Sequence, residues 1–182
     1  TFCQCERCRA LDAQLGVTDG TITDRLMVFY NQVAAALKER DLEKYRGKYL
    51  GFLAYQNYTK PPRTVVPDEM VLVEVVYPFW DRCYVHNLDD RHCPSNAEFM
   101  EWLRGWAKLC RHFGMYVFYG NCEFVNPFPV LHVIPNHLRT LKDLGGEALL
   151  VESPQHWATL GLNYYLASQL IWDVHRDVEA LW

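Results

Sequence analysis

Residues Met70 to Tyr77 have the sequence MVLVEVVY, a run of apolar and mostly β-branched side chains that predicts a buried strand. Similar runs predict three more strands at residues 48–56, 115–119 and 147–152. Apolar residues at helical spacing predict helices at residues 24–39, 95–111, 133–144 and 158–172. Strands that alternate with helices in this order indicate an α/β fold with a parallel sheet covered by helices.

Three local signals set the expected helix ends. Thr23 precedes the first helix and is expected to be its N-cap. Ser95 and Glu98 have the spacing of a capping box at the start of the second helix. Gly145-Gly146 is expected to end the third helix in a left-handed turn. Residues 1–22 lack such signals and contain turn residues, so we expect a Cys-rich loop there.

The number of strands limits the choice of fold. Four predicted strands are too few to close a TIM-type barrel, which typically has eight strands and about 250 residues. A flavodoxin-like sheet is the alternative, although no Gly-rich phosphate loop follows any predicted strand. No repeat or linker divides residues 1–182, so we expect a single domain. The start Thr1-Phe2-Cys3, without an initiator Met or a signal-peptide core, leads us to expect a processed product or a fragment.

Charge and composition exclude several classes of partner. The formal net charge is −4, and no cluster of Lys and Arg is longer than two residues, which argues against nucleic-acid binding. No apolar run approaches the ~20 residues of a membrane span. Aromatic residues make up 14% of the chain, with six Trp and eleven Tyr. They fit either a cleft in which sugar faces stack on rings or a core rich in aromatic side chains.

In parallel α/β folds the active site lies at the C-terminal ends of the strands. The polar and aromatic side chains expected there are Tyr55, Gln56, Trp80, Asp81, His86, Tyr119, Asn121, Glu123 and Glu152. Acids among Trp and Tyr at one edge suit a glycosidase, in which one carboxyl protonates the leaving oxygen and another supports the oxocarbenium-like centre. We therefore predict Glu152 and Asp81 as catalytic residues. The predicted substrate-binding residues are Tyr55, Trp80, His86, Tyr119 and Asn121.

Each of these side chains also has a structural alternative. Glu152 directly follows the strand ALLV, and its other role would be an N-cap or ion-pair partner of the next helix. Asp81 lies in a longer loop and, like Glu123 and Asp89-Asp90, would otherwise be a solvated acid. His86 would otherwise form structural hydrogen bonds.

The cysteines suggest a cross-link near the start of the chain. The seven cysteines are at positions 3, 5, 8, 83, 93, 110 and 122. An odd number cannot be fully paired as disulfides within one chain, so the cysteines alone do not indicate whether the protein is in an oxidising or a reducing compartment. Cys3, Cys5 and Cys8 can supply three of the four ligands of a structural zinc ion, with Cys83 or Cys93 as the fourth. Disulfides that join one of these three cysteines to Cys83 or Cys93 are the alternative. Cys3 and Cys5 are not expected to pair with each other, because their close spacing strains the geometry of a disulfide.

Several segments together carry a family resemblance. They are residues 2–12 (FCQCERCRALD), 53–56 (LAYQ) with 60–62 (KPP), 82–88 (RCYVHNL) followed by Cys93 and Asn96, 127–129 (PFP), 151–152 (VE), and 164–166 (YYL) with 170–172 (LIW). In their order and spacing these segments resemble the bacterial domain of unknown function 4838. That domain overlaps glycoside hydrolase family 163, the endo-β-N-acetylglucosaminidases.

The resemblance implies that the four strands are strands five to eight of a TIM-type (β/α)8 barrel, so that the chain is the C-terminal half of a catalytic barrel. It further implies a retaining, endo-acting hydrolase of oligosaccharides or protein-linked glycans such as N-glycans. The acetamido oxygen of the substrate would be the nucleophile, one carboxylate would orient it, and another would be the general acid. No cofactor beyond a structural zinc ion is implied. The implied location is extracytoplasmic, which includes periplasmic, cell-surface and secreted proteins.

Two departures from the family pattern affect the predicted site. Family members carry Trp-Asp-Tyr where this chain has Phe118-Tyr119-Gly120, and Asp81 aligns with a family Glu. A further acid is implied upstream of residue 1, so we predict that residues 1–182 alone are inactive. The competing hypotheses are a non-catalytic carbohydrate-binding remnant and a zinc-stabilised interaction module, the latter resting on the three-cysteine segment.

Overall fold

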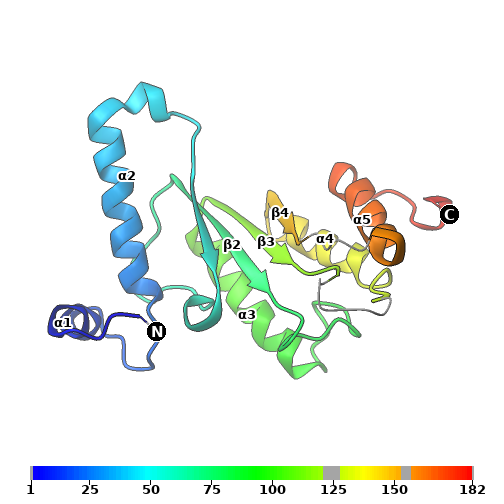
Figure 1. Cartoon of the computed structure of the whole chain (residues 1–182), viewed down its shortest axis with the longest axis horizontal. Coiled ribbons are helices and arrows are strands. Elements are labelled where there is room, and N and C mark those ends of the chain that lie inside the picture. Colours follow the sequence, from blue (N-terminus) through cyan, green and yellow to red (C-terminus); the bar gives the residue numbers. More distant parts are fainter. Residues whose placement is uncertain (1, 121–127, 153–156, 182) are drawn as a thin grey trace.

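The computed structural model describes residues 2–120, 128–152 and 157–181, and its centre is a four-stranded parallel sheet (Figure 1). The strands are β1 (Leu50–Ala54), β2 (Val71–Tyr77), β3 (His112–Val117) and β4 (Ala148–Val151), in the spatial order β1-β2-β3-β4. The helices are α1 (Glu6–Gln14), α2 (Thr23–Tyr45), α3 (Pro94–Leu109), α4 (Ile134–Asp143) and α5 (Trp157–Trp172), with 3-10 turns η1 (Gln56–Tyr58) and η2 (Glu179–Leu181). The predicted α/β class and parallel sheet are confirmed.

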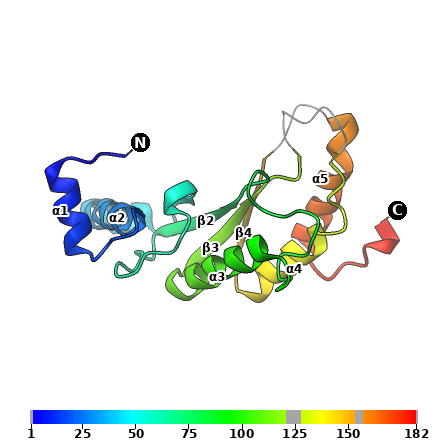
Figure 2. The ribbon, with the colours of Figure 1, turned by 90° about the horizontal axis from the view of Figure 1, so that it is seen from below.

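One face of the sheet is covered by helices and holds the core. Phe52 and Val73 are register partners on β1 and β2, and both are buried. Phe52 contacts Trp106 of α3 at a ring-centroid distance of 5.9 Å and Tyr30 of α2 at 5.1 Å. Figure 2 shows α3 and α4 on the same side of the strands. The periodicity that predicted helix 95–111 is confirmed here, because Phe99 and Trp106 are fully buried.

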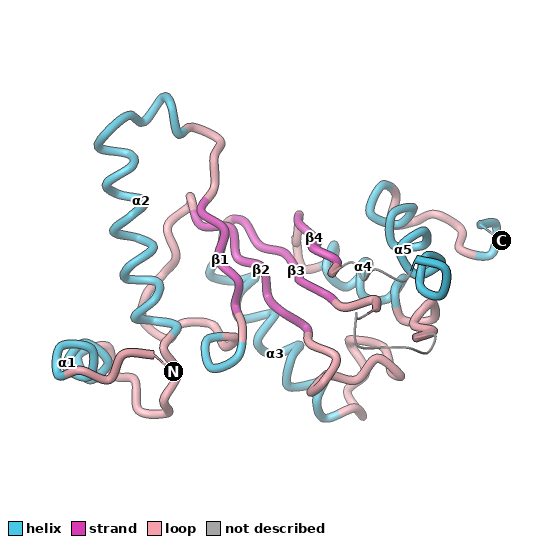
Figure 3. The backbone as a smooth tube through the Cα atoms, viewed as in Figure 1, coloured by secondary structure: helices cyan, strands magenta, loops and turns pink. Residues whose placement is uncertain are grey.

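The opposite face of the sheet is open within the described residues. Side chains alternate between faces along a strand, so Leu53, Glu74 and Tyr116 share this face. Leu53 and Leu150 are each 42% exposed on it, whereas Val73 and Met115 on the helix-covered face are fully buried. Parallel sheets are normally covered on both faces. Figure 3 shows the four neighbouring strands and the loops that leave their C-terminal ends.

The connection between β1 and β2 contains η1 and a loop in place of a helix. This loop is fastened to α2 by Asp24, which is 1% exposed. The Asp24 carboxylate accepts hydrogen bonds from the backbone N–H groups of Arg63, Thr64 and Val65 at 2.8–3.1 Å and from the Thr64 hydroxyl at 3.0 Å. Burial alone would raise the pKa of Asp24, but these donors outweigh it and lower the pKa. Asp24 is therefore an ionised structural residue.

The amino-terminal segment and two helix starts differ from the prediction. Residues 6–14, predicted as part of a loop, form α1, which has no buried residue and therefore no apolar periodicity to reveal it. Helix α2 has Ile22 as its N-cap, so Thr23 is its first residue. The predicted capping box is wrong, because α3 begins at Pro94 and Glu98 binds the Arg82 guanidinium at 3.1 Å. Gly145 does end α4, with a φ of 83°.

Strand β3 lies closer to the amino terminus than predicted. It begins at His112, which pairs with Leu72, and ends at Val117 instead of Tyr119. Gly114 obscured this start because glycine is a weak strand former. The structure explains why glycine stands there: a Cβ at Gly114 would lie 2.2 Å from the Ala148 carbonyl oxygen of β4. Beyond the strand, Phe118 is in phase with Tyr116 and stacks on it at the open face, whereas Tyr119 is in phase with the buried Met115 and Val117.

No described helix is both long and apolar enough to cross a membrane, in line with the expectation of no membrane span.

Candidate functional site

Aromatic side chains gather where β1, β2 and β3 end. This set, called the aromatic edge below, consists of Tyr55, Phe79, Trp80, Tyr116 and Phe118. Tyr116 stacks on Phe118 with ring centroids 5.1 Å apart and planes at 10°, and Phe118 contacts Phe79 and Trp80 at 5.6 and 5.5 Å. Trp80 also meets Tyr55 at 6.0 Å. Trp80 is 53% exposed, so part of its indole ring faces solvent.

Glu152 adjoins this aromatic edge from β4. The Tyr116 hydroxyl donates a hydrogen bond of 2.5 Å to Glu152 Oε2. The Tyr164 hydroxyl of α5 donates to the Glu152 carbonyl oxygen at 2.6 Å, and the Glu152 N–H donates to the Val117 carbonyl oxygen at 3.0 Å. Burial, followed by the neighbouring carboxylates, raises the pKa of Tyr116, which keeps its hydroxyl protonated as a donor. Both the backbone and the carboxylate of Glu152 are thus fixed in orientation.

Glu74 is a second acid on the same open face that the sequence analysis did not select. It lies in the middle of β2, and its charge, like that of Glu152, raises the pKa of Tyr116. Burial raises the pKa of Glu74 itself. A signal was present in the sequence, because Glu74 is the only charged residue in the strand sequence VLVEVVY. A charged side chain in a strand that is otherwise apolar needs a functional or structural reason.

Asp81, the other predicted catalytic acid, follows Trp80 but faces a cation. Its Oδ1 lies 3.6 Å from Arg82 Nε. Arg82 is well buried, and its guanidinium lies 4.6 Å from the Trp102 ring centroid and forms an ion pair with Glu98 at 3.1 Å. Asp81 is thereby attached to the α3 side of the loop, while Trp80 belongs to the aromatic edge.

Tyr119 is fully buried, so its predicted role as a substrate-binding residue is wrong for this structure. Its ring stacks on His137 of α4 at 5.9 Å, and its carbonyl oxygen accepts a hydrogen bond from Asn163 at 2.7 Å. The physical reason is the alternation of side chains, because Tyr119 is in phase with Met115 and Val117, which are buried on the helix-covered face. Phe118 takes the place at the open face. Asn121 and Glu123 lie outside the described residues.

The loop between β2 and α3 holds the other predicted polar residues. His86 is exposed, and its Nδ1 lies 3.2 Å from Asp90 Oδ2. Asp89 accepts a hydrogen bond from the Asn136 side chain at 2.9 Å. These acids therefore have structural partners. In the part of the chain that the structure describes, the His86 side chain pairs with Asp90 and not with the aromatic edge, and its predicted substrate contact stays a prediction.

The three amino-terminal cysteines converge as expected, but Cys83 does not join them. The Sγ atoms of Cys3, Cys5 and Cys8 all lie within 4.8 Å of one another. Cys83 instead lies at Asn96, whose amide donates to the Cys83 carbonyl oxygen at 3.0 Å, and its thiol interacts with Cys93. All six described cysteines are free thiols, and Cys122 lies outside the described residues. Among the described residues, Cys83 is not part of the three-thiol cluster, and none of the six cysteines forms a disulfide.

The electrostatic environment of Cys5 favours its thiolate. The Cys8 backbone N–H, then the thiols of Cys3 and Cys8, lower the pKa of Cys5 to about 7. The hydrogen bonds with Cys5 and Cys3 raise the pKa of the Cys8 thiol. Cys5 is therefore expected to lose its proton before Cys8 does.

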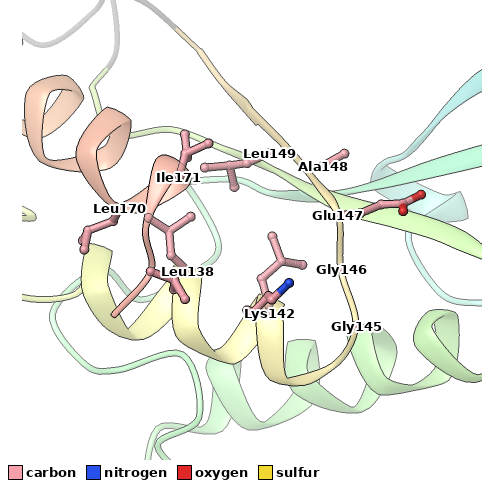
Figure 4. A pocket seen from close by; sticks show the side chains of 11 residues that line it. Leu138, Lys142, Gly145, Gly146, Glu147, Ala148, Leu149, Leu170 and Ile171 are labelled. Atoms are coloured by element: carbon pink, nitrogen blue, oxygen red, sulfur yellow. The ribbon is translucent and has the colours of Figure 1, made fainter. Parts of the chain in front are cut away.

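Cavities lie near both ends of β4. One of about 430 Å³, lined by Val151, Trp157 and Tyr164, adjoins Glu152, whose carbonyl oxygen accepts a hydrogen bond from the Tyr164 hydroxyl. A second cavity, of about 410 Å³, lies where β4 begins, between α4 and α5 (Figure 4). It is lined mainly by apolar side chains such as Leu138, Leu149 and Ile171, with Lys142 and Glu147 at its border. Glu147 pairs with His112 of β3. Because this is the opposite end of β4 from Glu152, this second cavity adds nothing to the candidate site.

A family model described as Domain of unknown function (DUF4838) matches residues 1–182, the full length of the chain. No curated protein and no solved structure matches the chain.

Proposed function

The chain belongs to the family described as a domain of unknown function (DUF4838), and from the chemistry of its site we propose that the protein is a glycoside hydrolase. The proposed type is a retaining, endo-β-N-acetylglucosaminidase-like enzyme as in glycoside hydrolase family 163. The observation that carries this proposal is the Glu152 carboxylate, held by Tyr116 beside the aromatic edge. Flat aromatic rings suit the apolar faces of sugars, and a fixed carboxylate suits the positive charge that develops during glycoside cleavage.

The proposal includes a fold: the four strands form one half of a TIM-type barrel, as strands five to eight. Three features support it. The strands are neighbours in chain order, all are parallel, and the helices that contact the sheet contact one face. A doubly wound sheet would carry helices on both faces. The open face with Leu53 and Leu150 would become the barrel interior.

In the proposed reaction the acetamido carbonyl oxygen of the substrate attacks the anomeric carbon. The bond to the leaving sugar breaks, and its oxygen takes a proton from a general acid. Glu152 accepts the acetamido N–H, which stabilises the cyclic oxazoline that forms. Water then opens this ring from the face that the leaving group vacated, so the β configuration is retained. The Tyr116 hydroxyl orients Glu152 for this role.

The second proposed catalytic carboxylate, that of Asp81, is held by contacts on the α3 side of its loop and not by the aromatic edge. Asp81 keeps its proposed place as a catalytic acid because it lies beside Trp80 after β2. Its Oδ1 lies 3.6 Å from Arg82 Nε, and this ion pair would have to separate before Asp81 could reach the leaving oxygen of a substrate. Another acid, contributed by the part of the protein outside residues 1–182, remains part of the proposal. For this reason we expect residues 1–182 alone to release no product.

The proposed substrate is an oligosaccharide or a protein-linked glycan, and the proposed location is extracytoplasmic. No cofactor takes part in the proposed reaction.

A specific observation also favours a second function, in which the aromatic edge binds a glycan without turnover. Asp81 is paired with Arg82, and Tyr119, at the position of a family acid, is buried. In that case the protein would be a non-catalytic carbohydrate-binding remnant.

The test compares the full-length protein with its Glu152→Gln variant on a complex N-glycopeptide, with released oligosaccharide measured by mass spectrometry. We expect the wild type to release glycan and the variant to lose about 10³-fold in rate. Glu147→Gln is the matched control, because Glu147 also adjoins β4 but lies at its opposite end.

Three outcomes separate the hypotheses. Retained activity in Glu152→Gln would make Glu152 structural and direct the search to Asp81→Asn. A wild type that binds the glycan without cleaving it would favour the carbohydrate-binding remnant. A wild type that neither binds nor cleaves any tested glycan would refute both functions.

A further inference from the structure

The three-thiol group lies on a segment that is fixed before any ion arrives. Phe2 packs edge-on against Tyr58 of η1 with ring centroids 5.5 Å apart. The Cys3 carbonyl oxygen accepts a hydrogen bond from Arg25 of α2 at 3.1 Å, and Arg25 also lies 3.4 Å from Asp12 of α1. Figure 1 shows α1 and the amino terminus beside the first turns of α2. Helix α1 is therefore tied to α2 on both sides of the thiols.

The local backbone explains why three side chains meet. Cys5 is the N-cap of α1, with extended dihedral angles of −63° and 164°, and Cys8 follows in the first turn of the helix. An N-cap side chain and the side chain three residues later lie on the same side of a helix start. Cys3 precedes Cys5 by two residues in the extended chain, so its side chain points to the same side as that of Cys5.

The spacing of the sulfur atoms is close to that of a metal site. Sulfur atoms that each lie about 2.3 Å from one zinc ion are roughly 3.8 Å apart at the tetrahedral angle. The three Sγ atoms are within 4.8 Å of one another, so a contraction of side chains alone would bring them to that spacing. Cys3 and Cys5 are exposed and Cys8 is half-buried, which leaves access from solvent.

We propose that Cys3, Cys5 and Cys8 bind one thiophilic metal ion of the Zn²⁺ class through three sulfur ligands, with the fourth coordination position open. Thiolates select zinc and copper(I) over harder ions such as Mg²⁺ and Ca²⁺. Structural zinc sites are closed by four protein ligands, whereas an open position is typical of sites that bind water or another ligand. Among the described residues, no further Cys, His, Asp or Glu joins the three sulfur atoms, and Cys83 is held at Asn96, so the fourth position is left to a ligand such as water.

This inference is independent of the glycosidase proposal, since it rests on the thiol geometry alone. It also means that the CxCxxC segment binds a metal ion instead of forming a disulfide. An odd set of three thiols cannot pair completely within itself. One metal ion would engage all three and would link the extended segment to the start of α1.

The experiment uses the full-length protein, purified under reducing conditions and stripped of metal with a chelator. Co²⁺ is titrated first, because thiolate ligation gives a charge-transfer absorption, and Zn²⁺ then displaces it. The variants are Cys3→Ser, Cys5→Ser, Cys8→Ser and the triple variant. Cys83→Ser and Cys110→Ser are the matched controls, because both remove a thiol outside the group. Circular dichroism reports on the fold of each variant.

We expect the wild type and both controls to bind one equivalent more than the triple variant. Each single variant in the group should bind at least about tenfold more weakly, since a ligand is lost outright. An equal metal content in the wild type and the triple variant would overturn the proposal. An equal loss in Cys83→Ser would overturn the three-ligand composition. If the triple variant does not fold, the three single variants decide by the same comparison with the controls.

Discussion

Among single residues, two acids on the open face of the sheet act on one hydroxyl. The charges of Glu152 and Glu74 both raise the pKa of Tyr116, but only Glu152 accepts its hydrogen bond. Glu152 is thus fixed by a hydrogen bond, whereas Glu74 has no such bond to Tyr116 and burial raises its pKa.

The pH dependence of stability should report this difference at Glu74. Because burial raises its pKa, the folded chain holds the proton at pH values where the unfolded chain has released it. The free energy of unfolding should thus fall as the pH rises from the ordinary Glu value of about 4.3 through the raised value. We expect Glu74→Gln to be slightly more stable than the wild type at pH 7, with no difference near pH 4.

Urea denaturation of both proteins at pH 4 and pH 7 measures this effect. Glu101→Gln on the exposed side of α3 is the control, and it should leave the pH dependence unchanged. An identical pH dependence in the wild type and Glu74→Gln would show that Glu74 titrates normally in the folded protein.

Tyr116→Phe should separate positioning from binding. The substitution keeps the ring that stacks on Phe118 and removes the hydroxyl that donates to Glu152. If Glu152 orients the acetamido group as proposed, kcat should fall by about tenfold while KM stays nearly constant, because one hydrogen bond of about 1.5 kcal/mol is lost. Steady-state kinetics on a glycopeptide give both values.

Tyr165→Phe, an exposed tyrosine of α5, is the control for the loss of a hydroxyl. A rise in KM at constant kcat in Tyr116→Phe would contradict the positioning role and would assign the hydroxyl to substrate binding.

The sequence predicted part of this residue-scale arrangement. The rule that sites lie at strand ends found Tyr55, Trp80 and Glu152, which all lie at the open face or the aromatic edge. It chose Tyr119 wrongly because it used the position of a residue at the strand end without its face: Tyr119 alternates in phase with Met115 and Val117, which are buried on the helix-covered face. It omitted Glu74 because an acid within a strand was not weighed as a buried polar group.

Among secondary-structure elements, long amphipathic helices and apolar strands were predictable, whereas contacts distant in sequence were not. Helix α3 has a strong apolar face and was found, but its capping box was not formed because Arg82, from the preceding loop, binds Glu98. Helix α1 has no buried residue, so its sequence contains no periodic signal. A contact between residues far apart in sequence thus replaced the local capping interaction, and a pattern in a single sequence cannot predict such a contact.

Asp24 allows a prediction about the packing of these elements, because it attaches the β1–β2 loop to α2. Replacing it with Ala leaves three partly buried backbone N–H groups, those of Arg63, Thr64 and Val65, without their acceptor. We expect Asp24→Ala to lower the free energy of unfolding by about 2–3 kcal/mol at pH 7. Because the folded pKa is lowered, the stabilisation by Asp24 should be present above about pH 4 and should be lost as the pH falls through the folded pKa.

Thermal or urea unfolding at pH 7 and at acidic pH measures both parts of this prediction. Asp177→Ala is the control, because this exposed acid accepts only the nearby Glu179 N–H, at 3.0 Å. A loss of stability in Asp24→Ala no larger than in Asp177→Ala would mean that the loop is held by other contacts, such as that of the Trp106 indole with the Thr59 carbonyl oxygen.

In the whole molecule, the decisive feature is a parallel sheet with one uncovered face. The alternation of strands and helices predicted the sheet and its direction, since each crossover helix returns the chain to the same edge. It could not tell whether a second layer of this chain covers the other face, because apolar side chains such as Leu53 and Leu150 occur in both cases. The family resemblance, not the periodicity, suggested a barrel.

The barrel proposal makes a prediction about Leu150, which is 42% exposed on the open face. If the full-length protein closes a barrel around this face, Leu150→Lys would place an ammonium group in a packed interior. The free energy of unfolding should then fall by about 2–4 kcal/mol, because a buried apolar side chain is lost and a charge is buried without a partner. On an open sheet face the same substitution should change stability by less than about 0.5 kcal/mol.

Leu162→Lys on the exposed side of α5 is the matched control and should be nearly neutral in either case. The measurement is urea denaturation of the full-length wild type and the two variants, followed by intrinsic Trp fluorescence. If Leu150→Lys is as mild as Leu162→Lys, the open face remains in contact with solvent and the half-barrel proposal fails. If only Leu150→Lys is strongly destabilising, the open face is buried against further chain, as a barrel requires and as a sheet with one solvated face does not.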